Sequence, residues 1–422
     1  MVTARRWKKG GGLAIAIGTG SLLITCTPPE TPATGPAPET LAPEIRVGVV
    51  IGASRVEVAG DSGLSVFDAD SAGAGSVDPG VSLAVRADGP LLSAGGTGGW
   101  RLDGQVSLRF IPRLAGGLLI LNGRPYRGRL TVTRDRTGVT AINTVGLEEY
   151  LTGVVPAEMG RRDPSEAEAL AAQAILSRTF AIRNLGKRAS EGFDLYATVV
   201  DQVYGGVAAE NPLASEAVQR TAGQIITWQG SPIDAFFFST CAGRTAEGTE
   251  VYVGADRPYL KSIRDVDGAG QPWCSISPRY QWREEWTAEQ LRGVLRQSLP
   301  PATGTSAEDA ATATGVSVAS RTASDRVASV TVQLLRGSVD VSGPAVRQVL
   351  HPLNEPLLRS AVFRLREVRS NGRLERLVAE GNGAGHGVGF CQWGAVGRAR
   401  GGQDALTILS AYFPGTSVSR AY

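Results

Sequence analysis

The segment GHGVGFCQWGA, from Gly385 to Ala395, gathers several side chains that could do chemistry within one short stretch. It places His386, one of only two histidines in the chain, between glycines and continues into Cys391, Gln392 and Trp393. Glycine adopts positive φ and lets another backbone or a ligand approach closely, so polar side chains on such a loop are presented. The segment therefore predicts one wall of a binding or catalytic site. The alternative is a tight turn with an incidental histidine.

Two roles are open to this histidine. His386 could assist proton transfer or donate a hydrogen bond to a ligand. It could instead pair with Cys391 as a thiol nucleophile, which would make the protein a thiol hydrolase or acyltransferase. That chemistry also needs a third group to orient the pair, and the sequence offers none.

A carboxyl group in an apolar setting is the second chemical feature. Glu158 ends the run VVPAE, in which Pro156 restricts the backbone two residues earlier. Apolar surroundings disfavour the charged form and raise the pKa of a carboxyl group, which suits a general acid near neutral pH. The alternative is a glutamate at a helix start that makes a cap or a salt bridge.

Short alternating runs and helical patterns must position these residues. Residues 45–140 contain short alternating runs split by Gly, Asp and Pro, which predict antiparallel strands. A hairpin with its turn near Thr137 and Gly138 closes this part. Apolar spacing and cap residues then predict helices over 165–185, 211–221, 287–297 and 404–413. The low-complexity stretch 300–315 is expected to be a surface loop. The fold class is α+β, with central and C-terminal helices packed on mixed or antiparallel sheet.

The N-terminus has the composition of an export signal. Residues 1–26 begin with basic side chains, continue through the short apolar run 13–24 and end at Cys26. Cys26 is placed like the lipidated cysteine of a bacterial lipoprotein; an uncleaved anchor or ordinary cleavage nearby are the alternatives. The Pro-rich residues 27–44 resemble a tether without a core. We expect an exported protein of the cell envelope, attached to the membrane by this segment or a lipid.

The charge balance excludes one class of partner. The chain has 43 Lys and Arg against 40 Asp and Glu, a formal net charge of +3. Nothing in this near balance favours a nucleic acid, so none is expected. We expect no cofactor either.

Five blocks in order resemble the sporulation stage II protein D family, also called the amidase-enhancer family. They are VGLEEYLTGVVPAEM (145–159), EALAAQAILSRTFAIRN (168–184), DQVYGG (201–206), FFFSTCAGRTA (236–246) and the GHGVGFCQWGA segment. The resemblance extends from about Ile45 to the C-terminus. It implies an N-terminal β-rich part over 45–140 and a catalytic core over 141–422.

The resemblance also implies roles for individual residues. Glu158 matches the family's proposed catalytic glutamate, and Arg178 is expected to face the site and steady Glu158 or the substrate. Further side chains suit contact with sugars through amides, hydroxyls or an aromatic face; Trp393 could equally belong to the core. These expected substrate-binding residues are Gln202, Tyr204, Ser239, Thr240, His386, Gln392 and Trp393.

The expected function is that of a lytic transglycosylase that cleaves peptide-stripped peptidoglycan glycan strands and leaves anhydro-muramic ends. One acid/base glutamate suffices for it, because the sugar's own hydroxyl is the nucleophile. Glu148 and Glu149, the candidates for a second carboxylate, are expected to be structural. The alternative function is a non-catalytic, glycan-binding enhancer of an N-acetylmuramoyl-L-alanine amidase.

Three cysteines remain when Cys26 is set aside. The resemblance favours a disulfide between Cys241 and Cys274, with Cys391 as a free thiol. A bridge to Cys391 or a three-cysteine metal site are the alternatives, although the spacings match no standard zinc pattern. Some family members bind zinc just before the DQVY block. The corresponding segment 191–204 has no histidine or cysteine here, so no metal is expected.

Overall fold

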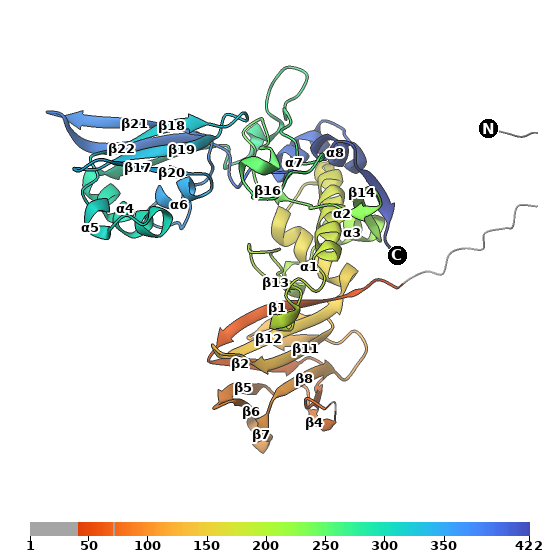
Figure 1. Cartoon of the computed structure of the whole chain (residues 1–422). Coiled ribbons are helices and arrows are strands. Elements are labelled where there is room, and N and C mark those ends of the chain that lie inside the picture. The colour runs from red at the N-terminus through yellow and green to blue at the C-terminus, as the bar shows by residue number, and fades with distance from the viewer. Residues whose placement is uncertain (1–40, 71) are drawn as a thin grey trace, which may run out of the picture. The chain divides into compact units, whose positions relative to one another are not determined.

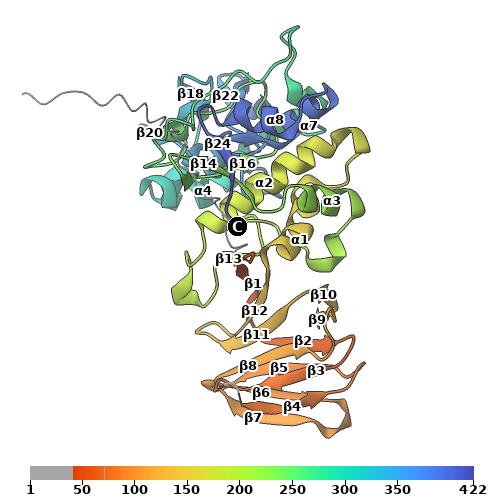
Figure 2. The ribbon, with the colours of Figure 1, turned by 90° about the vertical axis from the view of Figure 1, so that its right-hand side faces the viewer.

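The alternating runs of the N-terminal part form two sheets that lie against each other (Figures 1 and 2). The computed structural model describes residues 41–70 and 72–422; the expectations for residues 1–26, for Cys26 and for most of the tether lie outside them. The first sheet is antiparallel except for the β13–β1 pair, in the order β13 (Leu195–Tyr196), β1 (Glu44–Ala53), β12 (Val139–Gly146), β11 (Arg129–Arg134), β8 (Ser107–Pro112), β3 (Leu64–Phe67) and β4 (Gly73–Val77). The second has the order β10 (Arg124–Tyr126), β9 (Leu119–Leu121), β2 (Arg55–Gly60), β5 (Leu83–Asp88), β6 (Leu91–Gly96) and β7 (Arg101–Gln105).

Side-chain alternation explains how these sheets close on a core. In β2, Val56 and Val58 are buried while the alternate residues Arg55 and Glu57 are exposed, as expected for a strand with one face in water. The predicted hairpin is confirmed: β11 and β12 pair up to Arg134 and Val139, across the turn that contains Gly138.

A buried helix organises the next part. Helix α2 (Ala167–Arg183) contacts α1 (Leu147–Met159), α3 (Pro212–Arg220), α7 (Gln392–Arg400) and α8 (Ala405–Tyr412) (Figure 1). Its many alanines are buried around the whole helix, which allows close approach from several sides. The predicted helix is confirmed; its start signal forms the 3-10 turn Pro164–Glu166, which Asp163 caps. The predicted helices at 211–221 and 404–413 are confirmed too, with Asn211 and Asp404 as N-caps.

Two small sheets join the middle of the chain to its end. One contains β15 (Ser231–Pro232), β14 (Gln224–Trp228) and β24 (Ser417–Arg420). In the other, β16 (Phe237–Phe238) pairs in parallel with β23 (Phe390–Cys391). The second pair places the GHGVG loop directly beside the STCAG segment.

Residues 281–382 form a separate hydrophobic core within the part that the sequence assigned to a single catalytic core. Its strands form the sheets β17 (Gln281–Thr287), β22 (Arg373–Asn382) and β21 (Phe363–Ser370), and β18 (Gly315–Arg321), β19 (Val327–Gln333) and β20 (Ser338–Ser342). Its helices α4 (Ala288–Thr303), α5 (Ala307–Ala310) and α6 (Ala345–Val349) gather on one side of the strands (Figure 1). Gln281 pairs with Asn382, so the chain enters and leaves this region at one place.

The prediction of a surface loop over 300–315 is wrong. Helix α4 starts at its predicted cap, Thr287, but continues through Pro300 and Pro301 to Thr303, and α5 follows. The prolines lie in the last turns, and buried Leu299 anchors that end of the helix. Gly304 then ends the helix in the left-handed conformation.

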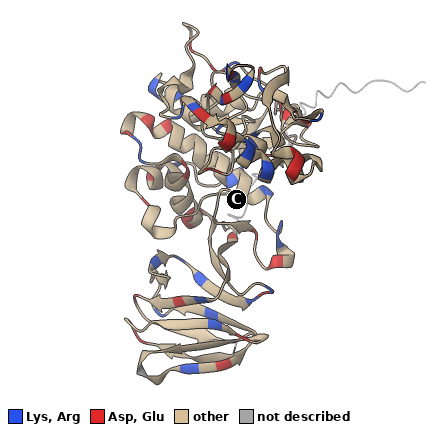
Figure 3. Cartoon of the chain, turned by 90° about the vertical axis from the view of Figure 1, so that its left-hand side faces the viewer, with Lys and Arg blue, Asp and Glu red and all other residues tan. Residues whose placement is uncertain are grey.

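The first hydrophobic core runs from Ile45 to Phe413 and includes both the N-terminal strands and the helices. It therefore continues across residue 140, where the sequence placed a boundary. The expected α+β class is confirmed. Lys and Arg are interspersed with Asp and Glu over the ribbon, in keeping with the near-balanced charge (Figure 3). Among the described helices, none has the length and apolar character needed to cross a membrane.

Candidate functional site

Four of the expected site residues line one cavity of about 450 Å³. They are Glu158, Ser239, His386 and Gln392. Aromatic side chains supply much of the remaining wall, and one Lys and one Asp complete its polar part: Phe180, Phe236, Phe237, Phe238, Tyr252, Lys187 and Asp201. An apolar, aromatic cavity with few polar groups is typical of a ligand site.

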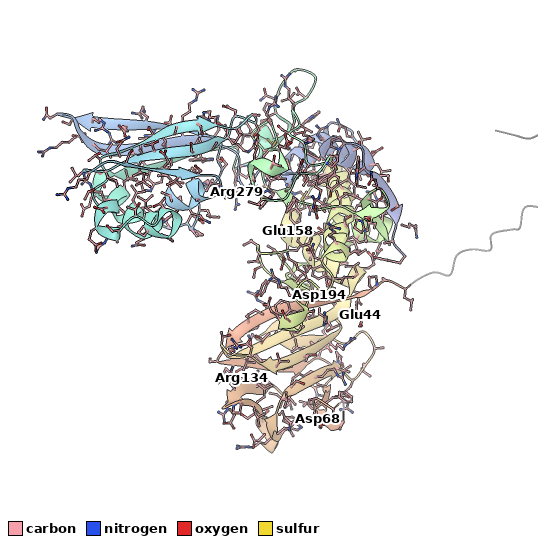
Figure 4. The ribbon with its side chains drawn as sticks, viewed as in Figure 1. Glu44, Asp68, Arg134, Glu158, Asp194 and Arg279 are labelled. Atoms are coloured by element: carbon pink, nitrogen blue, oxygen red, sulfur yellow. The ribbon has the colours of Figure 1, made fainter. Side chains whose placement is uncertain are left out.

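Glu158 lies in the last turn of α1, not at a helix start (Figure 4). Its Oε1 accepts a hydrogen bond of 2.7 Å from the backbone N–H of Val203, and the side-chain amide of Gln392 donates to Oε2 at 3.5 Å. Burial raises the pKa of the Glu158 carboxyl group, although these two donors oppose the shift. The negative end of a helix dipole also disfavours an added negative charge there. Glu158 is thus a carboxyl group held in the cavity with a tendency to keep its proton.

Asp201 is the other carboxylate of the cavity wall, and two cations compensate its negative charge. Its side chain is fully buried and accepts from Lys187 Nζ at 2.8 Å and from Arg188 Nε at 3.1 Å. Burial alone would raise the pKa of Asp201, but Lys187, the backbone N–H of Tyr196 and Arg188 lower it below its usual value. Asp201 therefore remains an ionised partner of two cations.

Both ring nitrogens of His386 are occupied by backbone groups. Nε2 lies 2.8 Å from the carbonyl oxygen of Phe237, and Nδ1 accepts from the N–H of Val388 at 3.2 Å. This pairing requires the neutral tautomer with its proton on Nε2. Burial lowers the pKa of His386 to about 4. The expected proton transfer or donation to a ligand would first have to break one of these bonds.

The glycines around this histidine let two backbones run side by side. Gly389 has a φ of 78°, and a Cβ there would collide with the carbonyl oxygen of Phe236. Gly385 has a φ of 106°, and a Cβ there would come within 2.8 Å of the Cβ of Phe238. The loop follows strand β16 because these positions carry no side chain.

Arg178 does not face the cavity, which corrects the expectation for this residue. It is fully buried and forms two hydrogen bonds of 2.7 Å with the carboxylate of Glu148. It also donates to the carbonyl groups of Val218 and Gln224. In line with the sequence, Glu148 is structural, and Glu149 is exposed. The resemblance identified the arginine, but only the packing of α2 decided its partner.

Gln202 and Tyr204 are also internal, contrary to their expected contact with sugars. The Gln202 side chain is fully buried, accepts from the hydroxyl of Tyr150 at 3.2 Å and lies beside the carbonyl of Ser177. The hydroxyl of Tyr204 donates to Asn143 at 3.0 Å. The DQVY block contributes to the site through the N–H of Val203 and through Asp201.

Thr240 and Trp393 lie outside the cavity wall. The hydroxyl of Thr240 is buried 2.9 Å from that of Ser277. The Trp393 ring is stacked by the guanidinium of Arg162 at 4.4 Å. Ser239 keeps a hydroxyl on the wall, 3.2 Å from that of Thr240.

The three described cysteines are free, so the structure lacks the disulfide expected between Cys241 and Cys274. Their sulfur atoms lie 3.5 Å apart, well beyond the roughly 2.05 Å of a covalent S–S bond. Cys391 lies beside them, and its sulfur contacts the N–H of Cys241. As expected, Cys391 is a free thiol, but among the described residues no hydrogen bond joins its side chain to that of His386.

Sequence reasoning missed part of the cavity wall. Phe236 and Phe237 belong to the FFFSTCAGRTA block, whose run of aromatic residues is the signal that the sequence offers for this part of the wall. The sequence gives Asp201 and Lys187 opposite charges, but it does not indicate that the pair lies at the cavity. Nothing in the sequence around Tyr252 indicates that its ring would pack against Phe236 and His386.

Comparisons with known proteins agree with the resemblance. A family model described as Stage II sporulation protein matches residues 135–228, and one described as Domain of unknown function (DUF8618) matches 274–389, which includes the second core. Stage II sporulation protein D of Bacillus subtilis is 32% identical over 301 residues, 68% of this chain and 78% of the relative. An uncharacterized protein of Brachyspira hyodysenteriae is 30% identical over 71% of this chain and 73% of its own length. The amidase enhancer of Bacillus subtilis is 27% identical over 64% of this chain and 40% of its own. The chain belongs to the stage II sporulation protein D family.

Proposed function

We propose that this protein is a lytic transglycosylase that cleaves peptidoglycan glycan strands, with Glu158 as the acid and then the base. Family membership supports the coarser statement that its role is connected with the cell wall. The observation that carries the finer proposal is the contrast between the two carboxyl groups of the cavity. Asp201 is held by two cations, while Glu158 is desolvated and has no ion-pair partner among the described residues.

One protonated carboxyl group is enough for this reaction. Glu158 would donate its proton to the glycosidic oxygen as the bond to the anomeric carbon of the muramic acid breaks. The primary hydroxyl of the same sugar would attack that carbon, and the Glu158 carboxylate would take the hydroxyl proton. An ordinary glycosidase uses a second carboxylate as base or nucleophile. Here an intramolecular hydroxyl replaces it, and ring closure needs no external partner.

The cavity wall suits a glycan from which the peptides have been removed. Its aromatic rings offer flat apolar surfaces for sugar faces, while Ser239 and Gln392 offer hydrogen bonds. His386 would contribute its neutral ring to the wall rather than a proton.

The direct test incubates the purified protein with peptide-stripped glycan strands and analyses the products by mass spectrometry. We expect anhydro-muramic ends, and we expect Glu158→Gln to reduce their formation by at least about 10²-fold, the usual contribution of a positioned acid or base. Glu149→Gln is the matched control, because Glu149 is an exposed glutamate of the same helix. Equal product from both variants would refute the assignment of Glu158.

The second candidate is a non-catalytic enhancer of an N-acetylmuramoyl-L-alanine amidase, favoured by the relative that bears the name amidase enhancer. In that case the cavity would bind glycan without cleaving it. An amidase assay with and without this protein separates the two functions. Stimulation that survives Glu158→Gln, with no glycan cleavage by the protein alone, supports the enhancer. Both functions require a location at the cell wall, which we propose is reached through the N-terminal segment.

A further inference from the structure

Three cysteines that are far apart in the sequence meet in the interior. Cys241 lies in the middle of the STCAG turn (239–243), Cys274 lies in the 3-10 helix Trp273–Ile276, and Cys391 is the N-cap of α7. All three are buried and free, and their sulfur atoms lie within 4.8 Å of one another. Of the described groups of His, Cys, Asp and Glu, this one has the mutual spacing of a ligand set.

The separation between the sulfurs fits a shared ion. Two thiolates bound to one tetrahedral Zn²⁺ at about 2.3 Å each would have sulfurs roughly 3.8 Å apart. The Cys241–Cys274 separation is 3.5 Å, close to that value and far from a covalent bond. A disulfide would also join only two of the three sulfurs and leave the third without a partner.

Backbone N–H groups point at the sulfurs. Cys391 Sγ accepts from the N–H groups of Cys241 and Gly394, both at 3.2 Å, and Cys241 Sγ accepts from Gly243 at 3.3 Å. The Gly394 donor belongs to the first turn of α7, whose dipole favours a negative sulfur. Ala242 takes a φ of 64°, so the backbone between Cys241 and Gly243 is turned tightly. Such donors stabilise thiolates, and buried thiolates require a compensating cation.

A carboxylate lies beside one of the three sulfurs. Asp265 is fully buried, and its Oδ2 is 3.2 Å from Cys241 Sγ. Its other oxygen accepts from Arg398 Nε at 3.0 Å, and the hydroxyl of Tyr412 donates to Oδ2 at 2.8 Å. Partners of this kind orient a ligating carboxylate. Three thiolates and one carboxylate carry four negative charges, of which Zn²⁺ and Arg398 together offset three.

We propose that Cys241, Cys274, Cys391 and Asp265 form a structural Zn²⁺ site. It differs from the sequence expectation of no metal, and none of its ligands comes from the segment 191–204, for which the resemblance raised the question of zinc. The site would tie the STCAG turn, the Trp273–Ile276 helix and the start of α7 together. Two residues that line the cavity beside Glu158 lie close to these ligands in the chain: Gln392 directly follows Cys391, and Ser239 lies two residues before Cys241. The proposal does not depend on the protein being a transglycosylase.

The test measures metal, thiols and stability on the full chain. Protein purified without chelator is analysed for metal content by mass spectrometry, and its intact mass shows whether a disulfide is present. We expect about one zinc per chain, no disulfide among these three cysteines and a lower thermal midpoint after the zinc is removed. Cobalt added to the metal-free chain should show thiolate-to-metal charge transfer and tetrahedral d–d absorption.

Variants then test the ligands. Cys241→Ser, Cys274→Ser and Cys391→Ser should each weaken zinc binding at least 10-fold and abolish the zinc-dependent shift in thermal midpoint. Asp265→Asn should weaken binding as well, while the control Ser275→Ala, next to Cys274, should not. If a cysteine variant does not fold, the cobalt spectrum of the unaltered chain and the Asp265→Asn titration decide.

Three results would overturn the proposal. The first is a chain that lacks zinc and is two hydrogens lighter through a disulfide among these cysteines. The second is a chain with free thiols that takes up neither zinc nor cobalt. The third is a chain that is purified with copper in place of zinc, because the proposal assigns the ion as Zn²⁺. Glycan cleavage is not a readout, so failure of the proposed function leaves the metal result intact.

Discussion

Glu158 illustrates how a single residue depends on surroundings supplied by three segments. Its own helix end, the N–H of Val203 and the amide of Gln392 converge on one carboxyl group. Burial favours the protonated form, while the two donors favour the ionised form. Such a group can lose and regain a proton within one reaction cycle, as the proposed mechanism requires.

The same environment predicts a stability effect at residue 158. Because the pKa of Glu158 is raised in the folded state, its ionisation costs stability as the pH rises through that pKa. Below the unfolded value both states are protonated and the cost vanishes. The free energy of unfolding of Glu158→Gln, relative to that of the unaltered protein, should therefore be higher at pH 7 than at pH 4. Urea unfolding of both proteins at both pH values measures this difference. A variant that is destabilised equally at both would show that the ionised carboxylate is not disfavoured in the fold.

His386 predicts the opposite pH dependence. Its folded pKa of about 4 lies below the ordinary value of 6.5, so the unfolded chain takes up a proton first as the pH falls. Stability should decrease from pH 6.5 downward, with a total loss on the order of 3 kcal/mol near pH 4. Urea unfolding of His386→Gln should show a correspondingly smaller loss over this range. The control is His351→Gln, which replaces the other histidine; if it abolished the pH dependence instead, the assignment to His386 would be wrong.

At the scale of elements, the pair of Arg178 and Glu148 joins the two helices that lead to the site. Arg178 comes from α2 and Glu148 from the first turn of α1, and Glu148 also accepts from the N–H of Gly223 and the hydroxyl of Tyr422. The Arg178 side chain has no exposed surface, whereas 27% of the Glu148 side chain is exposed. This buried pair holds α1, and with it Glu158, in position.

Breaking this pair should be costly. Glu148→Gln leaves the charge of Arg178 buried without its carboxylate, and such a change typically costs about 3–5 kcal/mol. We expect a loss in this range by chemical denaturation. Glu57→Gln is the control, since its pair with Arg55 has 61% and 50% of the two side chains exposed and should contribute less than about 1 kcal/mol. Similar losses of unfolding free energy in both variants would show that the buried pair contributes no more to stability than the exposed pair.

At the scale of the whole molecule, two hydrophobic cores coexist in residues 41–422. The core with Trp286, Leu295 and Phe363 belongs to residues 281–382, while the other includes the N-terminal strands and the helices around α2. Separate cores are a reason to expect separate unfolding events.

Residues 281–382 should therefore fold on their own. The two ends of this segment, Gln281 and Asn382, pair with each other in the β17–β22 ladder. Cutting the chain outside them therefore leaves this ladder complete. The isolated segment should show a cooperative thermal transition by circular dichroism, and calorimetry of the full chain should resolve it as one of two transitions. A segment that lacks a cooperative transition would show that its core depends on the rest of the chain.

Much of the local structure could be predicted from the sequence. The hairpin turn at Thr137 and Gly138 and the helix caps at Asn211, Thr287 and Asp404 rest on contacts within a few residues. The extension of α4 through Pro300 and Pro301 could not, because burial of Leu299 outweighs the local preference of the prolines. The second core was missed for a similar reason: its strands alternate like those elsewhere, and only their pairing separates it.

For the site, the sequence by itself determined which blocks matter, that Glu158 is a carboxyl group among apolar residues, and the family. It could not determine partners across long stretches of chain. Only the tertiary structure placed His386 against Phe237 and Arg178 against Glu148, and only it brought Cys241, Cys274 and Cys391 together. The physical reason is that a side chain's type and its near neighbours are local, whereas burial, ion pairing and the pKa depend on segments that meet only when the chain folds.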